Sequence, residues 1–199
     1  MKKINNIIFA LLAFPFSFTA NTDILLVKTP VLQNKTEKKV VEEKIVEEKV
    51  TVAIKSTSEK EEILWLARAV YSETKNSAEM EKIAWVVRNR VESERWGSSY
   101  KKVILSPNQF SGFNSRDPQY YTNINLNYDT NNRVWQKALL IAKEVYNADH
   151  KDRILNNSVQ HFYSPEVAKS PFWAEEEEPI LITYNDTGKQ TFRFYAGIE

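Results

Sequence analysis

The chain of 199 residues contains no cysteine, which excludes disulfide bonds, thiolate metal sites and a cysteine nucleophile. Its two histidines, His150 and His161, argue against a histidine-rich metal site, and we expect no cofactor. Only four glycines occur, and none belongs to a glycine-rich phosphate-binding loop. The formal net charge of +1 gives no global field that would favour nucleic acid as a partner. Aromatic residues are abundant, with five Trp, nine Tyr and ten Phe.

The first twenty positions have the pattern of an export signal. Lys2 and Lys3 form a basic start, and an almost unbroken apolar run follows over residues 7–18. This run is shorter than the roughly 20 residues that a membrane span needs. The expected cleavage site follows Ala20. Phe18 is the third residue before this site, a position where a small residue is usual. We therefore interpret residues 1–20 as a signal peptide or a retained membrane anchor, with a buried helix of the domain as the alternative. Either of the first two predicts an exported protein of the cell envelope, periplasmic or extracellular.

A charged segment separates this start from the rest of the chain. Within residues 21–57, the stretch over 35–55 consists mainly of Lys, Glu and Val, and VVEEK at 40–44 is nearly repeated as IVEEK at 45–49. A period of five matches neither the helical 3.6 nor the strand period of 2, so the apolar residues form no single stripe. The segment is predicted to be a solvated tether, with a short coiled coil or partner-binding helix as the alternative.

The folded domain is predicted to cover residues 58–199. Ser58 and Glu61 fit a capping box at the start of a helix that ends at Glu73. Ser77 is a plausible cap for a second helix, whose apolar residues hold helical spacing as far as Val91.

The remaining elements give the fold class. In chain order they are a short helix over residues 100–105, a loop over 108–128, a long helix over 131–146, and strands over 159–163, 180–184 and 191–195. The segment NDTGK at 185–189 is typical of a hairpin turn. Helices followed by a small antiparallel sheet predict an α+β domain.

Glu73 is the candidate catalytic residue. It ends an apolar helix and precedes a short polar break, a position that suits a carboxylate for work in a cleft. Trp65, Tyr71 and Trp85 could form a partly apolar wall, which would raise the pKa of the carboxyl by desolvation. The alternative interpretation is a solvated glutamate at the protein surface.

Three loops carry residues suited to sugars, because aromatic rings stack on the apolar faces of sugar rings and polar side chains pair with the hydroxyls. For Phe110 the competing interpretation is the hydrophobic core, and for His161 it is a structural histidine. The candidate substrate-binding residues are Tyr71, Gln109, Phe110, Ser111, His161, Tyr163 and Trp173.

Six segments, in this order, resemble the SleB-type cell wall hydrolases. They are LARAVYSE at 66–73, AWVVRNRV at 84–91, QFS at 109–111, HFYSP at 161–165, PFWA at 171–174 and FRFY at 192–195. The resemblance implies a lysozyme-like domain that cleaves peptidoglycan, with Glu73 in the catalytic position. The chain departs from the family after this residue, where TKNS at 74–77 replaces the usual Ala-Arg-Gly-Glu.

The number of acids suggests the reaction. Hydrolytic glycosidases use two carboxylates, and the candidates for a second, Glu79, Asp117 and Asp129, each fit a solvated position. A lytic transglycosylase needs one, and the resemblance implies the same reaction. We expect a monomer whose partner is the peptidoglycan glycan strand. A hydrolytic muramidase or glucosaminidase, a non-catalytic wall-binding module and an amidase remain as alternatives.

Overall fold

The computed structural model describes residues 56–198. The predicted signal or anchor over residues 1–20 therefore lies outside the described part, as does all but the end of the predicted tether. We call the helix at residues 56–73 the Glu73 helix. The elements that follow it are α2 (Ser77–Ser93), α3 (Tyr100–Ile104), η1 (Ser111–Phe113), α4 (Tyr120–Asn125), α5 (Arg133–Asn147), η2 (His150–Asp152), β1 (Val159–Tyr163), η3 (Phe172–Ala174), β2 (Leu181–Tyr184) and β3 (Gln190–Ala196). No helix among the described residues is both long and apolar enough to span a bilayer.

The three strands form one antiparallel sheet in the order β1-β3-β2, which confirms the predicted α+β class. β2 and β3 are joined by the predicted turn, where Gly188 has a φ of 78° that favours glycine. The side chain of Asn185 closes the turn by accepting hydrogen bonds from the amides of Thr187 and Lys189, at 3.1 and 2.9 Å. The turn chemistry thus fixes the pairing of these two strands.

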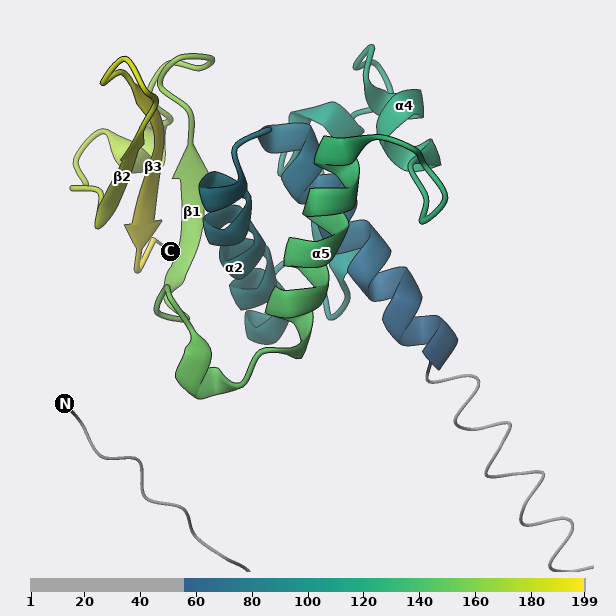
Figure 1. Ribbon diagram of the computed structural model, residues 1–199. Helices are drawn as coiled ribbons and strands as arrows, with labels where there is room; N and C mark the ends of the chain where they lie inside the picture. Colours follow the sequence, from purple (N-terminus) through teal and green to yellow (C-terminus); the bar gives the residue numbers. More distant parts are fainter. Residues whose placement is uncertain (1–55, 199) are drawn as a thin grey trace, which may run out of the picture. The chain divides into compact units, whose positions relative to one another are not determined.

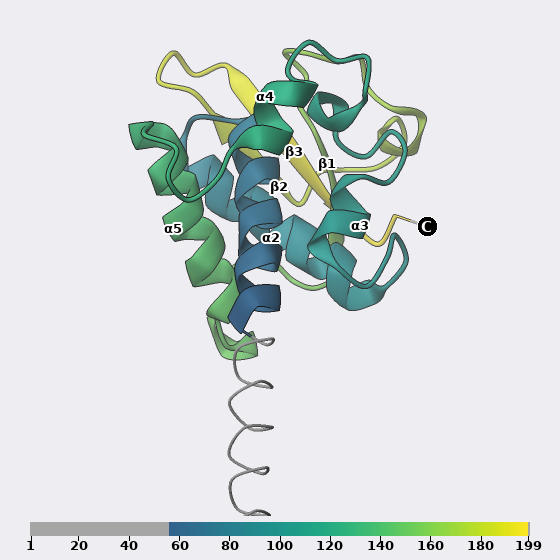
Figure 2. The same cartoon turned by 90° about the vertical axis from the view of Figure 1, so that its right-hand side faces the viewer.

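α2 lies at the centre of the domain. It contacts β1 on one side and α5 on another, and α3 also packs against it. Figure 1 shows the sheet, α2 and α5 as successive layers. In Figure 2 the Glu73 helix runs between α5 and α3. Because α2 has neighbours on several sides, its buried residues include Trp85 and Val86 as well as the predicted Ile83 and Val87.

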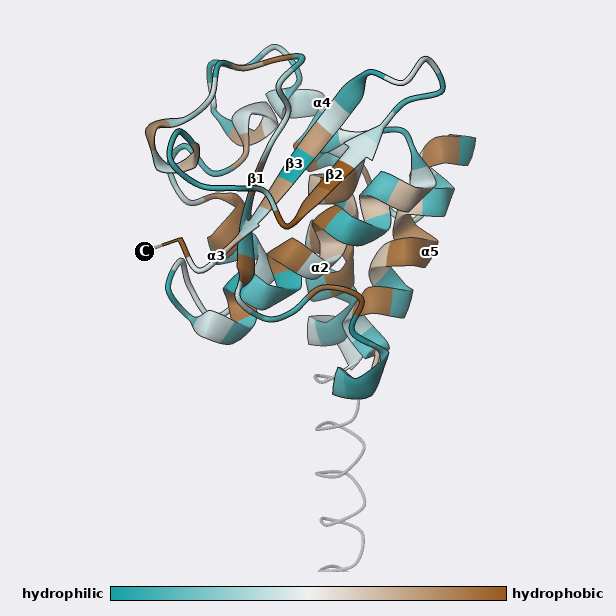
Figure 3. Cartoon of the chain, turned by 90° about the vertical axis from the view of Figure 1, so that its left-hand side faces the viewer, coloured by the Kyte–Doolittle hydropathy of each residue, from teal (hydrophilic) through white to brown (hydrophobic). Residues whose placement is uncertain are grey.

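α5 is amphipathic, and Figure 3 shows hydrophobic and hydrophilic patches alternating along it. Asn132 caps the helix by accepting hydrogen bonds from the amides of Val134 and Trp135, at 2.9 and 3.0 Å. The predicted face that contains Ala138 and Ile141 is buried. Trp135 joins it, is fully buried, and donates its indole N–H to the carbonyl of Asn127 at 2.6 Å.

Three local predictions were wrong. Ser58 does not cap a helix, because the chain is already helical at residue 56. The cap of α2 is Asn76, whose side chain accepts the amide of Ala78 at 2.9 Å, and Ser77 is the first helical residue. The segment 108–128 contains η1 and α4 rather than loop alone, since Asn123 is buried and its side chain donates to the carbonyl of Gly112 at 3.0 Å.

Candidate active site

Glu73 is the last residue of its helix, as predicted. The turns before it are held in the core by Leu66, Ala69 and Val70, all fully buried. The Glu73 side chain is half-buried, and among residues 56–198 no hydrogen bond or ion pair engages its carboxyl group. The helix therefore presents an acid that has lost much of its water but is free to contact a ligand.

Burial raises the pKa of Glu73 to about 7, and the positive charges of Arg90 and Lys75 oppose the rise. Desolvation as the cause agrees with the sequence-based expectation. Trp85 was expected to form part of an apolar wall around this acid. Its ring packs against the guanidinium groups of Arg88 and Arg153. A carboxyl group with a pKa near 7 can both give and take a proton at neutral pH.

Arg90 is the buried cation beside this acid. Its Nε atom donates to the carbonyl of Gln160 at 2.6 Å, and the rings of Phe110 and Phe162 flank the guanidinium. Burial lowers its pKa to about 10, while the charge of Glu73 opposes that shift. Arg90 therefore stays charged at neutral pH and favours the ionised form of Glu73.

His161 extends the site along β1. Its ring contacts Trp96 and Trp173, with ring centroids 5.5 and 5.0 Å away. Burial, assisted by the charges of Arg90 and Arg95, lowers its pKa to about 4. His161 is therefore neutral near pH 7, where it can donate or accept a hydrogen bond but carries no charge.

Two buried nitrogens of the described residues have no hydrogen-bond partner: Nη1 of Arg90 and Nδ1 of His161. Both side chains contact the Trp96 ring. Buried polar groups are normally paired, so these two atoms leave the polar contacts around the Trp96 ring incompletely satisfied.

Tyr163 and Trp173 lie on the outer face of the sheet, where their rings pack at a centroid distance of 6.0 Å. Tyr163 is largely buried, and its hydroxyl accepts a hydrogen bond from Nη1 of Arg193 at 3.2 Å. Trp173 is half-buried and also contacts His161. The structure thus joins these three predicted residues in one aromatic cluster.

The loop that carries Gln109, Phe110 and Ser111 meets the end of the Glu73 helix. A Cβ atom on Gly112 would lie 2.7 Å from Nδ2 of Asn123 and 3.5 Å from Cβ of Ser72, so a larger residue there would displace the Asn123 amide group. Gln109 is half-buried and Ser111 is exposed. Phe110 is 2% exposed, so its ring belongs to the hydrophobic core and offers no face to a ligand.

Tyr71 lies apart from the aromatic cluster. Its ring meets the Trp135 ring edge-on, with the ring centroids 5.7 Å apart. The ammonium group of Lys75 lies over the Tyr71 ring, 3.6 Å from its centroid. Lys75 also donates to the carbonyl of Tyr71 and so caps the end of the Glu73 helix. Lys75 therefore supplies a second positive charge near the acid.

Glu79 is a structural residue that the sequence interpretation placed in solvent. It is 5% exposed. Its two oxygens accept hydrogen bonds from the hydroxyls of Thr74 and Thr191, at 2.6 and 2.5 Å. Thr191 also pairs with Thr183 at 2.8 Å, so this network ties the residue after Glu73 to two strands. The signal in the sequence was the threonine directly after Glu73, but the second donor to Glu79, Thr191 on β3, lies 112 positions from it.

Asp117 and Asp129, the other candidates for a second catalytic carboxylate, show no feature of a catalytic acid. Asp117 accepts the amide of Gln119 at 2.7 Å within a turn, and Asp129 is exposed. Among residues 56–198 no group of three or more His, Asp or Glu side chains could hold a metal ion. The described part of the chain thus presents Glu73 as the acid best placed for chemistry.

A comparison with protein families identifies the family of the chain. The sequence model of the family described as Cell Wall Hydrolase matches residues 74–192, well over half of the chain. The match confirms the family predicted from the six ordered segments, and it begins one residue after Glu73. No curated protein and no solved structure matches the chain.

Proposed function

Since the chain belongs to the cell wall hydrolase family, we propose that it cleaves the MurNAc–GlcNAc bond of peptidoglycan by lytic transglycosylation, with Glu73 as acid and then base. Family membership supports peptidoglycan hydrolase activity in general. The choice of bond, of reaction and of Glu73 is our proposal. The predicted export signal supports a location in the cell envelope, which is part of this proposal.

The observation that carries the proposal is the pKa of about 7 at one half-buried, unpaired acid. In the first step, protonated Glu73 gives its proton to the glycosidic oxygen and the bond from that oxygen to the anomeric carbon breaks. In the second step, the Glu73 carboxylate takes the proton of the muramic acid 6-hydroxyl, whose oxygen bonds to the anomeric carbon. The product is a 1,6-anhydro sugar, no water is consumed, and Glu73 is protonated again.

The surroundings of Glu73 support the use of one residue for both steps. The cation of Arg90 stabilises the carboxylate left by the first proton transfer, while burial favours its return to the neutral acid. A hydrolytic mechanism would need a second carboxylate to activate water. The nearest candidate in the sequence, Glu79, is buried and has both oxygens engaged by threonines.

The products of digestion test the reaction. We expect mass spectrometry of purified sacculi treated with the protein to show anhydro-muramyl ends, because the substrate supplies the attacking oxygen. Each such end is lighter than a reducing end by one water. Fragments with reducing ends would instead show hydrolysis and contradict the proposed transglycosylation.

The pH dependence tests the role of Glu73 separately. The value of kcat/KM is expected to fall as the pH rises through about 7, because the first step needs the protonated acid of the free enzyme. Initial rates of sacculus solubilisation from about pH 5 to about pH 9 measure this profile. A rate that stays constant across that range would mean that no group with this pKa donates the proton.

A further inference from the structure

A basic groove lies beside the turn that follows the Glu73 helix. It has a volume of about 540 Å³ and is lined by Lys75 of that turn, by the first residue of α2 and by residues of the first half of α5. Its charged side chains are Lys75, Arg133 and Lys137, and its apolar contacts include Val134 and Leu140. A volume of this size lies within the range of about 300–1,000 Å³ typical of ligand sites.

The positive charge of the groove is not neutralised by the protein. No acidic side chain lines it, and within the described residues Arg133 and Lys137 form no ion pair. Lys75 is held in place by the ring and the carbonyl of Tyr71 rather than by a carboxylate. Three cations of this kind favour a ligand with more than one negative charge.

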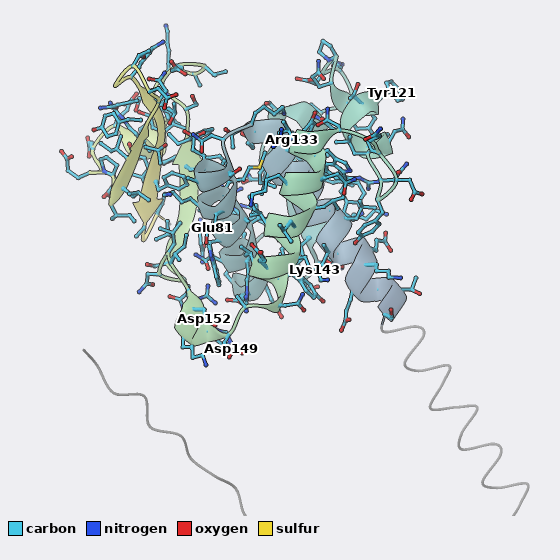
Figure 4. The ribbon with its side chains drawn as sticks, in the orientation of Figure 1. Glu81, Tyr121, Arg133, Lys143, Asp149 and Asp152 are labelled. Atoms are coloured by element: carbon cyan, nitrogen blue, oxygen red, sulfur yellow. The ribbon has the colours of Figure 1, made fainter. Side chains whose placement is uncertain are left out.

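Lys75 links the groove to the catalytic region. Lys75 lines it and is also close enough to Glu73 for the two charges to interact. Figure 4 shows Arg133 at the start of α5, near the turn, and Lys143 farther along the same helix. A ligand that contacts Lys75 in the groove is therefore bound by a cation whose charge also acts on the acid.

We propose that this groove binds the acidic stem peptide that branches from the muramic acid residue at the cleaved bond. The inference rests on the proposed function, since it assumes that the muramic acid lies at Glu73. The peptide carries free carboxylates for Lys75, Arg133 and Lys137, and its alanine methyl groups fit the apolar surface of Val134 and Leu140. The groove would select glycan strands that still carry their peptides.

Binding of two soluble fragments tests this selectivity without requiring cleavage. The probes are a GlcNAc–MurNAc disaccharide with a tetrapeptide and the same disaccharide without the peptide. We expect the double variant Arg133→Glu, Lys137→Glu to weaken binding of the first probe by roughly tenfold, because two attractive charges become repulsive. Binding of the second probe is expected to stay the same.

Lys143→Glu is the matched control, since it reverses an exposed charge on α5 outside this groove. It should leave both affinities unchanged. The milder pair Arg133→Gln, Lys137→Gln keeps the test valid if the first pair unfolds, which thermal melting would show. Amidation of the peptide carboxylates should reduce the difference between the probes in the wild-type protein.

The outcomes separate the two proposals. Equal affinity of the wild-type protein for both probes, or an equal loss for both in the double variant, would overturn the peptide groove. Sacculus cleavage that needs Glu73 while the probes bind equally well would keep the proposed function and reject the groove. Selective peptide binding without any cleavage of sacculi would reject the proposed function alone.

Discussion

Replacing Glu73 with glutamine is expected to lower the rate of sacculus cleavage by about 10²–10⁴-fold, the usual contribution of a general acid or base. Glutamine has the same size but cannot donate or take the proton. Because no hydrogen bond or ion pair within the described residues engages the Glu73 carboxyl, the substitution breaks no such contact. The measurement is release of soluble fragments from purified sacculi. Cleavage at the wild-type rate would remove Glu73 from the mechanism.

The stability of the same variant provides an internal control. Folding raises the pKa of Glu73 above its ordinary value, so the stabilising contribution is complete below about pH 4.5 and is lost as the pH rises through about 7. Glu73→Gln should therefore melt at or above the wild-type temperature at pH 8, outside that window. Glu144→Gln, an exposed position on α5, is the matched substitution and should retain full activity.

Replacing Glu79 with alanine is expected to lower the free energy of unfolding by about 3 kcal/mol, because it removes a buried side chain and leaves two partly buried threonine hydroxyls without the carboxyl group that accepts their hydrogen bonds. For a domain of this size the melting temperature should fall by about 10 °C. Thr74 follows Glu73 directly and is one of the two donors. The variant should consequently lose activity even at temperatures where it remains folded.

Glu81→Ala is the control for this prediction. Glu81 lies on the same helix, is exposed, and is labelled in Figure 4. Its replacement should change the melting temperature by little, since exposed substitutions away from special contacts usually cost under about 0.5 kcal/mol. Equal melting temperatures for the two variants would show that the threonine–carboxylate network contributes nothing to stability.

The sequence predicted the elements whose pattern is local. β1 spans the predicted residues, and the helical spacing of apolar residues found α2 and α5 to within about two residues at each end. Glu73 was found because it ends such a helix. α4 was missed because its segment is rich in Asn and Tyr and has no apolar stripe; Asn123 holds it through a bond to Gly112.

The parts of the site that depend on distant contacts could not be predicted. The role of Arg90 depends on the carbonyl of Gln160, which lies 70 positions away. Glu79 looked like a surface acid because its partner Thr191 is on β3. Both residues lie in or near segments that the sequence analysis identified. Whether such a residue is buried depends on the packed structure, because a buried glutamate and an exposed one have the same local sequence pattern.

The central position of β3 has a consequence for how the domain assembles. Neither β1 nor β2 pairs with the other, and each is joined to the sheet only through residues 190–196. The ribosome makes these residues after the Glu73 helix, α2 and α5 are complete. Among them is Thr191, whose hydroxyl donates a hydrogen bond to Glu79. The helices can therefore pack together early. The contacts that position the segment after Glu73 form only when β3 inserts between β1 and β2. A chain that ends before β3 would contain Glu73 but would lack the strand contacts that help to position it.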